Sequence, residues 1–466
     1  MMMKLRIEGR LRIGAAALVG ALVVTVACSD DEEQDTPGSD PTPSTESTSV
    51  GTPATVSPTE VAPTTAAPTT APPTTAPPTT APAESLFEVP TQRLDAIEGA
   101  GLTFVPVKYP TQPDDVPWPT RRWTRGTLER PLRGDVDRIV RRAFTKPQFE
   151  GDTIDAVVAV RGGELVAEEY NGWDPDEPHV SWSMAKSITQ SMVGRLVQEG
   201  RIDIWEPYAA PEWSDPADPR HGITLDMLLR MSSGLEWTED YGDGEGDVLR
   251  MLFGDRKRDR AHFVADRPLA AKPDTVWSYS TGTSNIVARA VADEVGLGRQ
   301  MTRWADRELF GKLGISGVRH SLDGTGLVNG GSVIDMKPTD FARFGLLYLR
   351  DGVWDGERLL PEGWVDYSRM PTPTANGVYG AHWWIDDADG SGDLGVVAFS
   401  AQGFNGQTIT IVPELDLVLV VLSAAPGGSD NQVRTQLVEA FAAARGAVTL
   451  VRRAAQLRGV TRMSDR

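Results

Sequence analysis

Two stretches of the chain carry the hydrophobic pattern of paired β-strands. Residues 154–160 form a run that is apolar apart from Asp155, Gly162 and Gly163 follow as a turn, and residues 164–170 alternate between apolar and polar side chains. This combination predicts a β-hairpin. Far along the chain, residues 408–413 and 415–422 repeat the pattern around Glu414 and predict a second hairpin.

Between and around these hairpins the apolar residues fall at helical spacing. Residues 135–144 and 183–198 place apolar side chains three and four positions apart, and Gly200 ends the second of these runs. The pattern predicts that residues 200–350 are mostly helical with loops, and that residues 432–444 form a closing helix. The pattern therefore predicts an α+β fold: an antiparallel sheet built from both chain ends, flanked by helices, with an inserted, mostly helical region.

The first residues read as a targeting segment. Residues 1–27 begin with basic side chains and continue as an apolar run that is short for a membrane-spanning helix. The run ends at Ala27-Cys28, which resembles a bacterial lipobox, in which the cysteine is acylated. We expect lipidation at Cys28 and an extracytoplasmic protein anchored to the membrane. A plain secretory signal that happens to end near a cysteine is the alternative.

Composition divides the rest of the chain. Residues 28–84 are acidic and rich in Pro and Thr, a composition that cannot bury a core and predicts a disordered, extended tether. Residues 85–447 have the mixed composition of a folded domain, and residues 448–466 form a basic tail.

Charge and cysteine content exclude several classes of protein. The net charge of −19 lacks the basic footprint of a nucleic-acid binder. A single cysteine allows no intramolecular disulfide, and the five histidines do not fall at the spacing of a helical metal pair. We therefore expect no nucleic-acid partner, no metal and no cofactor.

The candidate chemistry begins at Ser183-Met184-Ala185-Lys186, at the start of the helix predicted after the first hairpin. Residues three apart share a helix face, so the Lys186 amine can reach the Ser183 hydroxyl and serve as its base if burial lowers the pKa of the amine. The alternative is a purely structural role, in which Ser183 is a helix cap and Lys186 is a solvated residue of the first turn.

Several further blocks, in order, make the chain recognisable. They are Gly200 to Ile204, Ile223 to Leu235 (ITLDMLLRMSSGL), Trp277 to Gly282 (WSYSTG), Asp340 to Gly345 and Gly406-Gln407. Over residues 150–445 the chain resembles the serine β-lactamase and penicillin-binding-protein-like hydrolases, in particular the branch of class C β-lactamases, esterases and nylon-oligomer (6-aminohexanoate-dimer) hydrolases. The resemblance implies the β-lactamase/transpeptidase-like fold and an acyl-enzyme on Ser183.

The resemblance also assigns a second motif, in which Tyr279 is the proton-transfer partner of Lys186. The family has Tyr-x-Asn, whereas this chain has Tyr279-Ser280-Thr281. The Asn helps to bind the acylamino side chain of β-lactams, so Thr281 is expected in substrate binding but weakens the case for a β-lactam substrate. The alternative for Tyr279 is an ordinary half-buried tyrosine.

The third motif departs further from the family pattern of Lys-Thr-Gly. Here the matching residues are Ala401-Gln402-Gly403, followed by Phe404. The resemblance implies that Gln402 and Gly403 line the substrate and that the Phe404 N–H forms the oxyanion hole together with the Ser183 N–H. The alternative for Gln402 is that its amide caps a loop.

Taken together, the sequence predicts an extracytoplasmic serine hydrolase that cleaves a small ester or amide through Ser183, with Lys186 and Tyr279 transferring protons. Two other hypotheses stay open. One is a β-lactamase or D,D-peptidase acting on β-lactams or cell-wall peptides. The other is a non-catalytic, surface-binding lipoprotein that keeps the fold as a scaffold.

Overall fold

The computed structural model describes residues 87–145, 154–242, 246–387, 394–423 and 432–445. The chain divides into two compact units, Met1–Pro82 and Ala83–Arg466, and every described residue belongs to the second unit. The predicted signal segment, Cys28, the tether and the basic tail lie outside the described residues.

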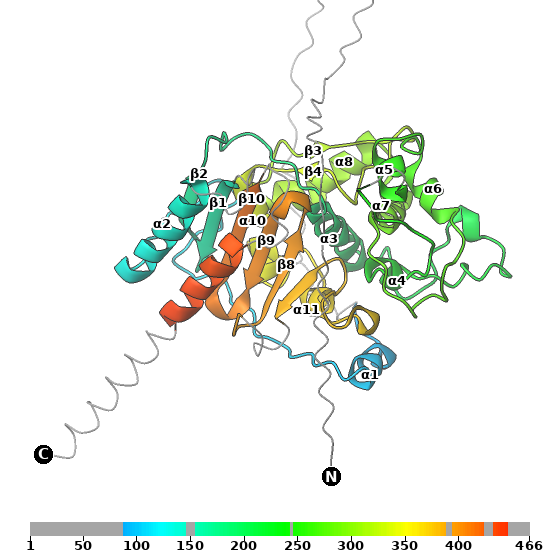
Figure 1. Cartoon of the computed structure of the whole chain (residues 1–466), viewed down its shortest axis with the longest axis horizontal. Helices are drawn as coiled ribbons and strands as arrows, with labels where there is room; N and C mark the ends of the chain where they lie inside the picture. Colours follow the sequence, from blue (N-terminus) through cyan, green and yellow to red (C-terminus); the bar gives the residue numbers. More distant parts are fainter. Residues whose placement is uncertain (1–86, 146–153, 243–245, 388–393, 424–431, 446–466) are drawn as a thin grey trace, which may run out of the picture. The chain divides into compact units, whose positions relative to one another are not determined.

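A six-stranded sheet organises the domain, with the strand order β2-β1-β10-β9-β8-β7 and antiparallel pairing throughout (Figure 1). The strands are β1 (Ile154–Arg161), β2 (Glu164–Tyr170), β7 (Trp384–Asp387), β8 (Ala398–Gln402), β9 (Thr408–Val412) and β10 (Leu417–Ser423). The first strand pairs with the last, for example Val157 with Val421. The predicted sheet built from both chain ends is confirmed.

Alternation along the strands gives the sheet two apolar faces. Residues such as Val157 and Leu419 face a cluster that includes Leu132 of helix α2 (Arg130–Thr145) and Leu437 of the helix over 432–445. Their neighbours face the larger cluster, which contains helices α3 (Met184–Gln198) and α10 (Pro338–Leu349). The sheet is therefore covered by helices on both faces, as expected for this α+β class.

Helices are the main regular elements of the inserted region, as predicted, and they group at one side of the sheet with loops between them (Figure 1). Its helices are α4 (Leu225–Leu229), α5 (Asp247–Leu252), α6 (Arg260–Ala265), α7 (Thr281–Val295), α8 (Arg299–Ala305), a π-helical turn (Asp306–Phe310) and α9 (Gly311–Leu313). The domain also contains two small antiparallel ladders, β3 (Arg319–His320) with β4 (Ile334–Asp335) and β5 (Val353–Trp354) with β6 (Glu357–Arg358). Helix α11 follows at Trp364–Arg369. Short 3₁₀ turns lie at Pro211–Trp213, Pro373–Ala375, Phe404–Gly406 and Pro413–Leu415.

The segment before α2 contains a short helix, α1 (Thr91–Gly99), that the sequence pattern did not indicate. Only Ile97 of this helix is buried, so the helix lacks the apolar stripe from which an amphipathic helix can be predicted. The helix is held instead by ion pairs from Arg93 to the buried Asp226 and, at 3.2 Å, to Asp274. These contacts attach the segment before α2 to the inserted helical region.

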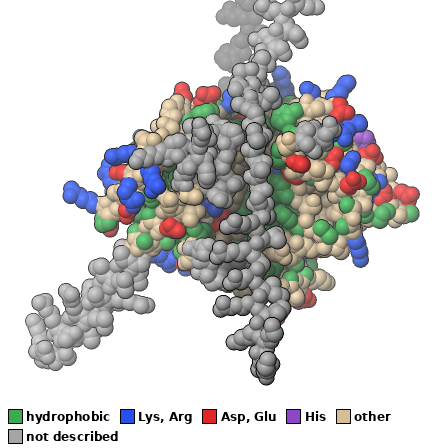
Figure 2. Space-filling model, viewed as in Figure 1, with side chains coloured by type: hydrophobic (Ala, Val, Ile, Leu, Met, Phe, Trp, Pro, Cys, Tyr) green, Lys and Arg blue, Asp and Glu red, His purple; other side chains and the backbone are tan. Residues whose placement is uncertain are grey.

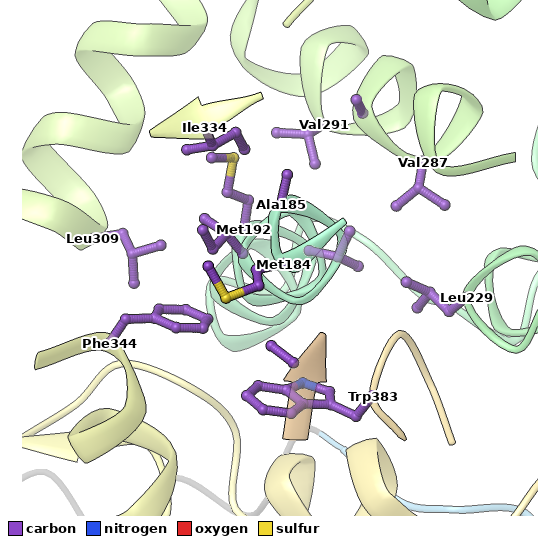
Figure 3. Packing of buried hydrophobic residues seen from close by; sticks show 14 of the residues in the cluster. Met184, Ala185, Met192, Leu229, Val287, Val291, Leu309, Ile334, Phe344 and Trp383 are labelled. Carbon is purple, nitrogen blue, oxygen red and sulfur yellow. The ribbon is translucent and has the colours of Figure 1, made fainter. Parts of the chain in front are cut away.

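Helix α3 lies in the interior and is buried nearly all round. Figure 3 shows Met184 and Met192 of this helix among Leu309, Phe344 and Trp383. A helix enclosed on every side has little freedom to tilt or slide. The residues at its N-terminus are therefore held in place by the core itself.

The surface of the domain is mixed in charge. Helix α2 exposes five arginines, which gather at one end of the face shown in Figure 2: Arg130, Arg133, Arg138, Arg141 and Arg142. Among the described residues, no helix combines the length and apolar character needed to cross a membrane.

Candidate active site

Ser183 lies at the N-terminus of α3, as the sequence predicts, and its side chain is half-buried rather than enclosed. Two hydrogen bonds fix the turn that precedes Ser183: the Ser181 N–H donates to Asp335 at 3.0 Å, and the Ser181 hydroxyl donates to the Ser332 carbonyl at 3.3 Å. Trp182 adopts a positive φ of 44°, a strained conformation for a bulky residue. The turn thus holds the Ser183 hydroxyl at a position that is partly open to solvent.

Lys186 is one turn into the helix and only 1% exposed. Its Nζ lies 3.0 Å from Ser183 Oγ, 2.9 Å from Thr281 Oγ1 and 2.8 Å from the Gly331 carbonyl oxygen. Burial lowers the pKa of Lys186 to about 8, against a smaller opposing effect of the negative charge of Glu239. A solvated first-turn lysine is thus excluded, and a substantial fraction of the amine is neutral in mildly alkaline solution.

Tyr279 stands beside this pair, with Lys186 Nζ 4.8 Å from the centre of its ring. The ring packs against Trp384 and Tyr379 at centroid distances of 5.5 and 5.9 Å. Burial, and then the charge of Glu239, raise the pKa of Tyr279 above its ordinary value, while a hydrogen bond with Ser183 acts in the opposite direction. Tyr279 is therefore a neutral phenol at pH 7, which suits proton delivery better than proton uptake.

Thr281, the residue in place of the family asparagine, is fully buried. Its hydroxyl accepts the hydrogen bond from Lys186 and donates one to Glu239. The sequence predicted a substrate contact at this position. In the structure, the Thr281 side chain instead lies between Lys186 and Glu239 and links the amine to the carboxylate.

Glu239 was not found by sequence reasoning. Its carboxylate accepts hydrogen bonds from the Trp237 indole at 2.5 Å, the Tyr241 hydroxyl at 2.8 Å, and both the N–H (2.9 Å) and the hydroxyl of Thr281. The residue lies in a loop segment, 42 positions before Thr281, and no spacing rule connects the two. The one available signal was its place shortly after the recognisable block that ends at Leu235.

Gly403 and Phe404 lie where β8 ends beside the serine turn. A Cβ added to Gly403 would meet the Ser181 carbonyl oxygen at 2.6 Å and the Trp182 Cβ at 3.2 Å. The Trp182 and Phe404 rings are 5.9 Å apart. Only a glycine permits this close backbone approach between the end of β8 and the turn that precedes Ser183.

Gln402 points to the other face of the sheet. Along β8, Phe399 and Ala401 belong to the α3 side, whereas Ala398 belongs to the side of α2 and the 432–445 helix. By strand alternation Gln402 shares the side of Ala398. Its amide donates to Ser400 Oγ at 2.9 Å and to Asp386 at 3.2 Å. The structure thus separates the Gln402 side chain from the other predicted site residues.

His382 supports the first turn of α3 from behind. Its Nδ1 lies 3.0 Å from the Lys186 carbonyl oxygen, its Nε2 lies 3.2 Å from Ser284 Oγ, and the Ser187 hydroxyl donates to its carbonyl at 2.6 Å. Burial and the nearby Lys186 charge lower the pKa of His382 to about 3, so the imidazole is neutral. Throughout the described ranges, no three His, Cys, Asp or Glu side chains gather as a metal site would require.

Comparison with known proteins identifies the family of the folded domain. The family described as Beta-lactamase matches residues 136–443. The 6-aminohexanoate-dimer hydrolase of Paenarthrobacter ureafaciens is 26% identical over 311 residues, which cover 60% of this chain and 74% of that protein.

Solved structures share the fold at lower identity. A Bacillus anthracis protein provisionally assigned as a 6-aminohexanoate-dimer hydrolase superposes with a TM-score of 0.55 and 22% identity, covering 75% of this chain and 93% of that one. A family VIII carboxylesterase superposes with a TM-score of 0.52 and 14% identity, covering 68% and 98%. Since the family match spans more than half of the chain, the chain belongs to the beta-lactamase family of hydrolases, and the resemblance drawn from its motifs is confirmed.

Proposed function

We propose that the protein hydrolyses a small ester or amide through an acyl-enzyme on Ser183, with Lys186 as the base. The contact between Lys186 Nζ and Ser183 Oγ at 3.0 Å, from an amine that burial holds at a pKa of about 8, carries this proposal. A serine hydroxyl needs a neighbouring base to attack a carbonyl, and a buried lysine can be neutral enough to act as one.

The proposed reaction has an acylation step and a deacylation step. The Ser183 oxygen bonds to the substrate carbonyl carbon while its proton passes to Lys186, which becomes an ammonium group. As the tetrahedral intermediate collapses, the bond to the leaving group breaks and the leaving group takes a proton from the neutral Tyr279 phenol, which Lys186 reprotonates. Water then releases the acyl group from Ser183 by the reverse sequence of proton transfers.

The developing oxyanion would be held by the N–H groups of Ser183 and Phe404. Among the described residues, neither N–H donates a hydrogen bond to another group of the chain. The Ser183 N–H also lies at the N-terminus of α3, where the helix dipole favours negative charge. Free donors beside the nucleophile are what stabilisation of a tetrahedral intermediate requires.

Substituting Gly403 by alanine should lower kcat by about 10- to 100-fold, because the new Cβ would push β8 away from the Ser181 carbonyl and displace the Phe404 N–H. The measurement is kcat and KM on the best ester found, with the melting temperature as a check on folding. Gly222→Ala, where an added Cβ meets nothing within 4 Å, is the matched control. Equal kcat for the two variants would contradict this role of Gly403.

The surroundings of the site favour an apolar acyl group without a carboxylate. Trp277, Tyr379 and Trp384 pack around Tyr279, and Phe404, which is 49% exposed, stacks with Tyr241 near Trp182. At the third motif the buried Ala401 stands where the family has a lysine. The match to a 6-aminohexanoate-dimer hydrolase supports small amides as well as esters.

A fluorophosphonate probe tests the proposed function directly. We expect one covalent adduct, located on Ser183 by peptide mass spectrometry, and none on the Ser183→Ala variant. A substrate panel of chromogenic esters, short amide oligomers and nitrocefin should then show turnover of esters or amides and little of nitrocefin. Stable acylation by labelled penicillin would favour the β-lactamase or D,D-peptidase alternative, and absence of any adduct would remove the catalytic proposal.

We further propose that the protein is an extracytoplasmic lipoprotein anchored to the membrane through Cys28. The basic head, the short apolar run and the lipobox-like Ala27-Cys28 support this location. Replacing Cys28 with serine should move the protein from the membrane fraction to the soluble fraction, as measured by fractionation and immunoblotting. A variant that stays in the membrane fraction would contradict lipidation at this residue.

A further inference from the structure

Behind Ser183, a continuous chain of hydrogen bonds leads to a carboxylate that the mechanism above does not use. Ser183 Oγ contacts Lys186 Nζ, which contacts Thr281 Oγ1, whose hydroxyl in turn bonds to Glu239. Lys186 and Thr281 are both inaccessible to solvent or nearly so, at 1% and 0% exposure. The relay therefore connects the reactive oxygen to Glu239 without passing through bulk water.

Glu239 is held rigidly at the end of this chain. One carboxylate oxygen accepts from the Tyr241 and Thr281 hydroxyls, and the other accepts from the Trp237 indole and the Thr281 N–H. All of these partners are donors, so the position is complementary to an ionised carboxylate, which can only accept. The oxygen that faces the Trp237 indole and the Thr281 N–H could not be replaced by an NH2 group without setting donor against donor, because neither N–H can accept.

This arrangement fixes the direction of every hydrogen bond in the chain. Because Glu239 can only accept, the Thr281 hydroxyl must give its proton to Glu239 and present a lone pair to Lys186. The Gly331 carbonyl is also solely an acceptor. Two N–H bonds of Lys186 are thereby committed to Thr281 and Gly331, and the third position on the nitrogen faces Ser183.

In the neutral amine that third position is the lone pair. We propose that Glu239 is a positioning residue of the active site, which orients the Thr281 hydroxyl and so presents the lone pair of neutral Lys186 to the Ser183 hydroxyl. When Lys186 takes the serine proton, the same carboxylate stabilises the ammonium group through Thr281. This inference rests on the proposed function, in which Lys186 is the base.

The charge of Glu239 acts on the same group. The titratable side chains around it are Lys186, Tyr279, Tyr241 and Tyr379, and His382 lies on the far side of Lys186 as a neutral imidazole. The negative charge of Glu239 raises the pKa of Lys186, in opposition to burial. Removing this charge therefore favours the neutral amine and moves the limb of a pH–rate profile toward lower pH.

The test measures the rate of Ser183 labelling by a fluorophosphonate across pH, in the full-length protein and its variants. Glu239→Gln should slow labelling on the pH plateau by about 10- to 100-fold through loss of orientation, and should shift the limb by about 1 pH unit toward acid. Glu236→Gln is the matched control, because it removes the same charge from an exposed neighbour that, within the described residues, forms an ion pair with Arg267 alone. Its profile should equal that of the parent protein.

Two Thr281 variants separate orientation from charge. Thr281→Val removes the bridging hydroxyl and should slow labelling about as much as Glu239→Gln, whereas Thr281→Ser keeps the hydroxyl and should restore most of the rate. The Glu239→Gln, Thr281→Val double variant should lose little more than either single variant, because both act through one bridge.

The outcomes distinguish this inference from the proposed function. If the parent protein takes no label on Ser183, the proposed function fails and the inference falls with it. If the parent labels normally but the folded Glu239→Gln and Thr281→Val variants keep its rate and limb, the inference alone is overturned. A uniform loss of rate with an unmoved limb would reduce Glu239 to a purely structural role and also overturn it.

Discussion

Replacing Lys186 with arginine is expected to lower the rate of Ser183 acylation by about 10⁴-fold or more. Arginine keeps a positive charge but does not deprotonate in proteins, so it cannot take the serine proton. If Lys186 acted only as a cation beside the oxyanion, arginine would preserve much of the rate. The substitution therefore separates a base from a mere charge, and the measurement is single-turnover acylation by an activated ester.

Lys186→Met is the companion variant, since it keeps an unbranched side chain one atom shorter and removes a charge from a position that is 1% exposed. It should be as inactive as Lys186→Arg and at least as stable as the parent protein, because a buried charge is costly. The parent rate should rise with pH through a limb near the Lys186 pKa of about 8. The observed limb belongs to the coupled Lys186–Tyr279 pair. Near-parental acylation by either variant would disprove the assignment.

Removing the Tyr279 hydroxyl with phenylalanine should cost about 10²- to 10⁴-fold in kcat on amides, the usual share of one acid–base group. The raised pKa of Tyr279 makes it a proton donor at neutral pH, so its loss matters most when the leaving group is basic. Esters of good leaving groups, which depart without protonation, should lose much less. The measurement is the ratio of the two losses.

Tyr379→Phe supplies the control for Tyr279, because its ring packs 5.9 Å from that of Tyr279 and, within the described residues, it has no contact with Ser183 or Lys186. It should retain near-parental kcat on both substrate types. A Tyr279→Phe variant with equal losses on amides and activated esters would argue that the phenol orients groups rather than protonating the leaving group.

The sequence predicted the parts of the site that depend on local spacing. Ser183 and Lys186 are three residues apart, so helix geometry alone brings them together. The sheet could also be predicted, because nearly continuous apolar runs at 154–160 and 415–422 are typical of strands covered on both faces. Tyr279, nearly a hundred residues away, could be placed only through the resemblance to a known family.

The remaining parts depend on information that spacing does not carry. Glu239 meets Thr281 only because the loop after Leu235 folds back over the start of α7, and no periodicity encodes that path. Gln402 was predicted to line the substrate, but its amide bonds to Ser400 and Asp386 on the opposite face of the sheet. A strand turns successive side chains to opposite sides, so a motif match locates the backbone but not the direction of a side chain unless the register is known.

The pairing of β1 with β10 has a consequence for how the protein is made. Partners such as Val157 and Val421 lie at opposite ends of the folded region, so the centre of the sheet closes only after nearly all of the domain has left the ribosome. Sheets dominated by such distant contacts fold slowly, since a long loop must close before the contacts form. A chain truncated before β10 would leave the apolar edge of β1 open to association with other chains. The central pairing of the sheet therefore has to wait until β10 has been synthesised.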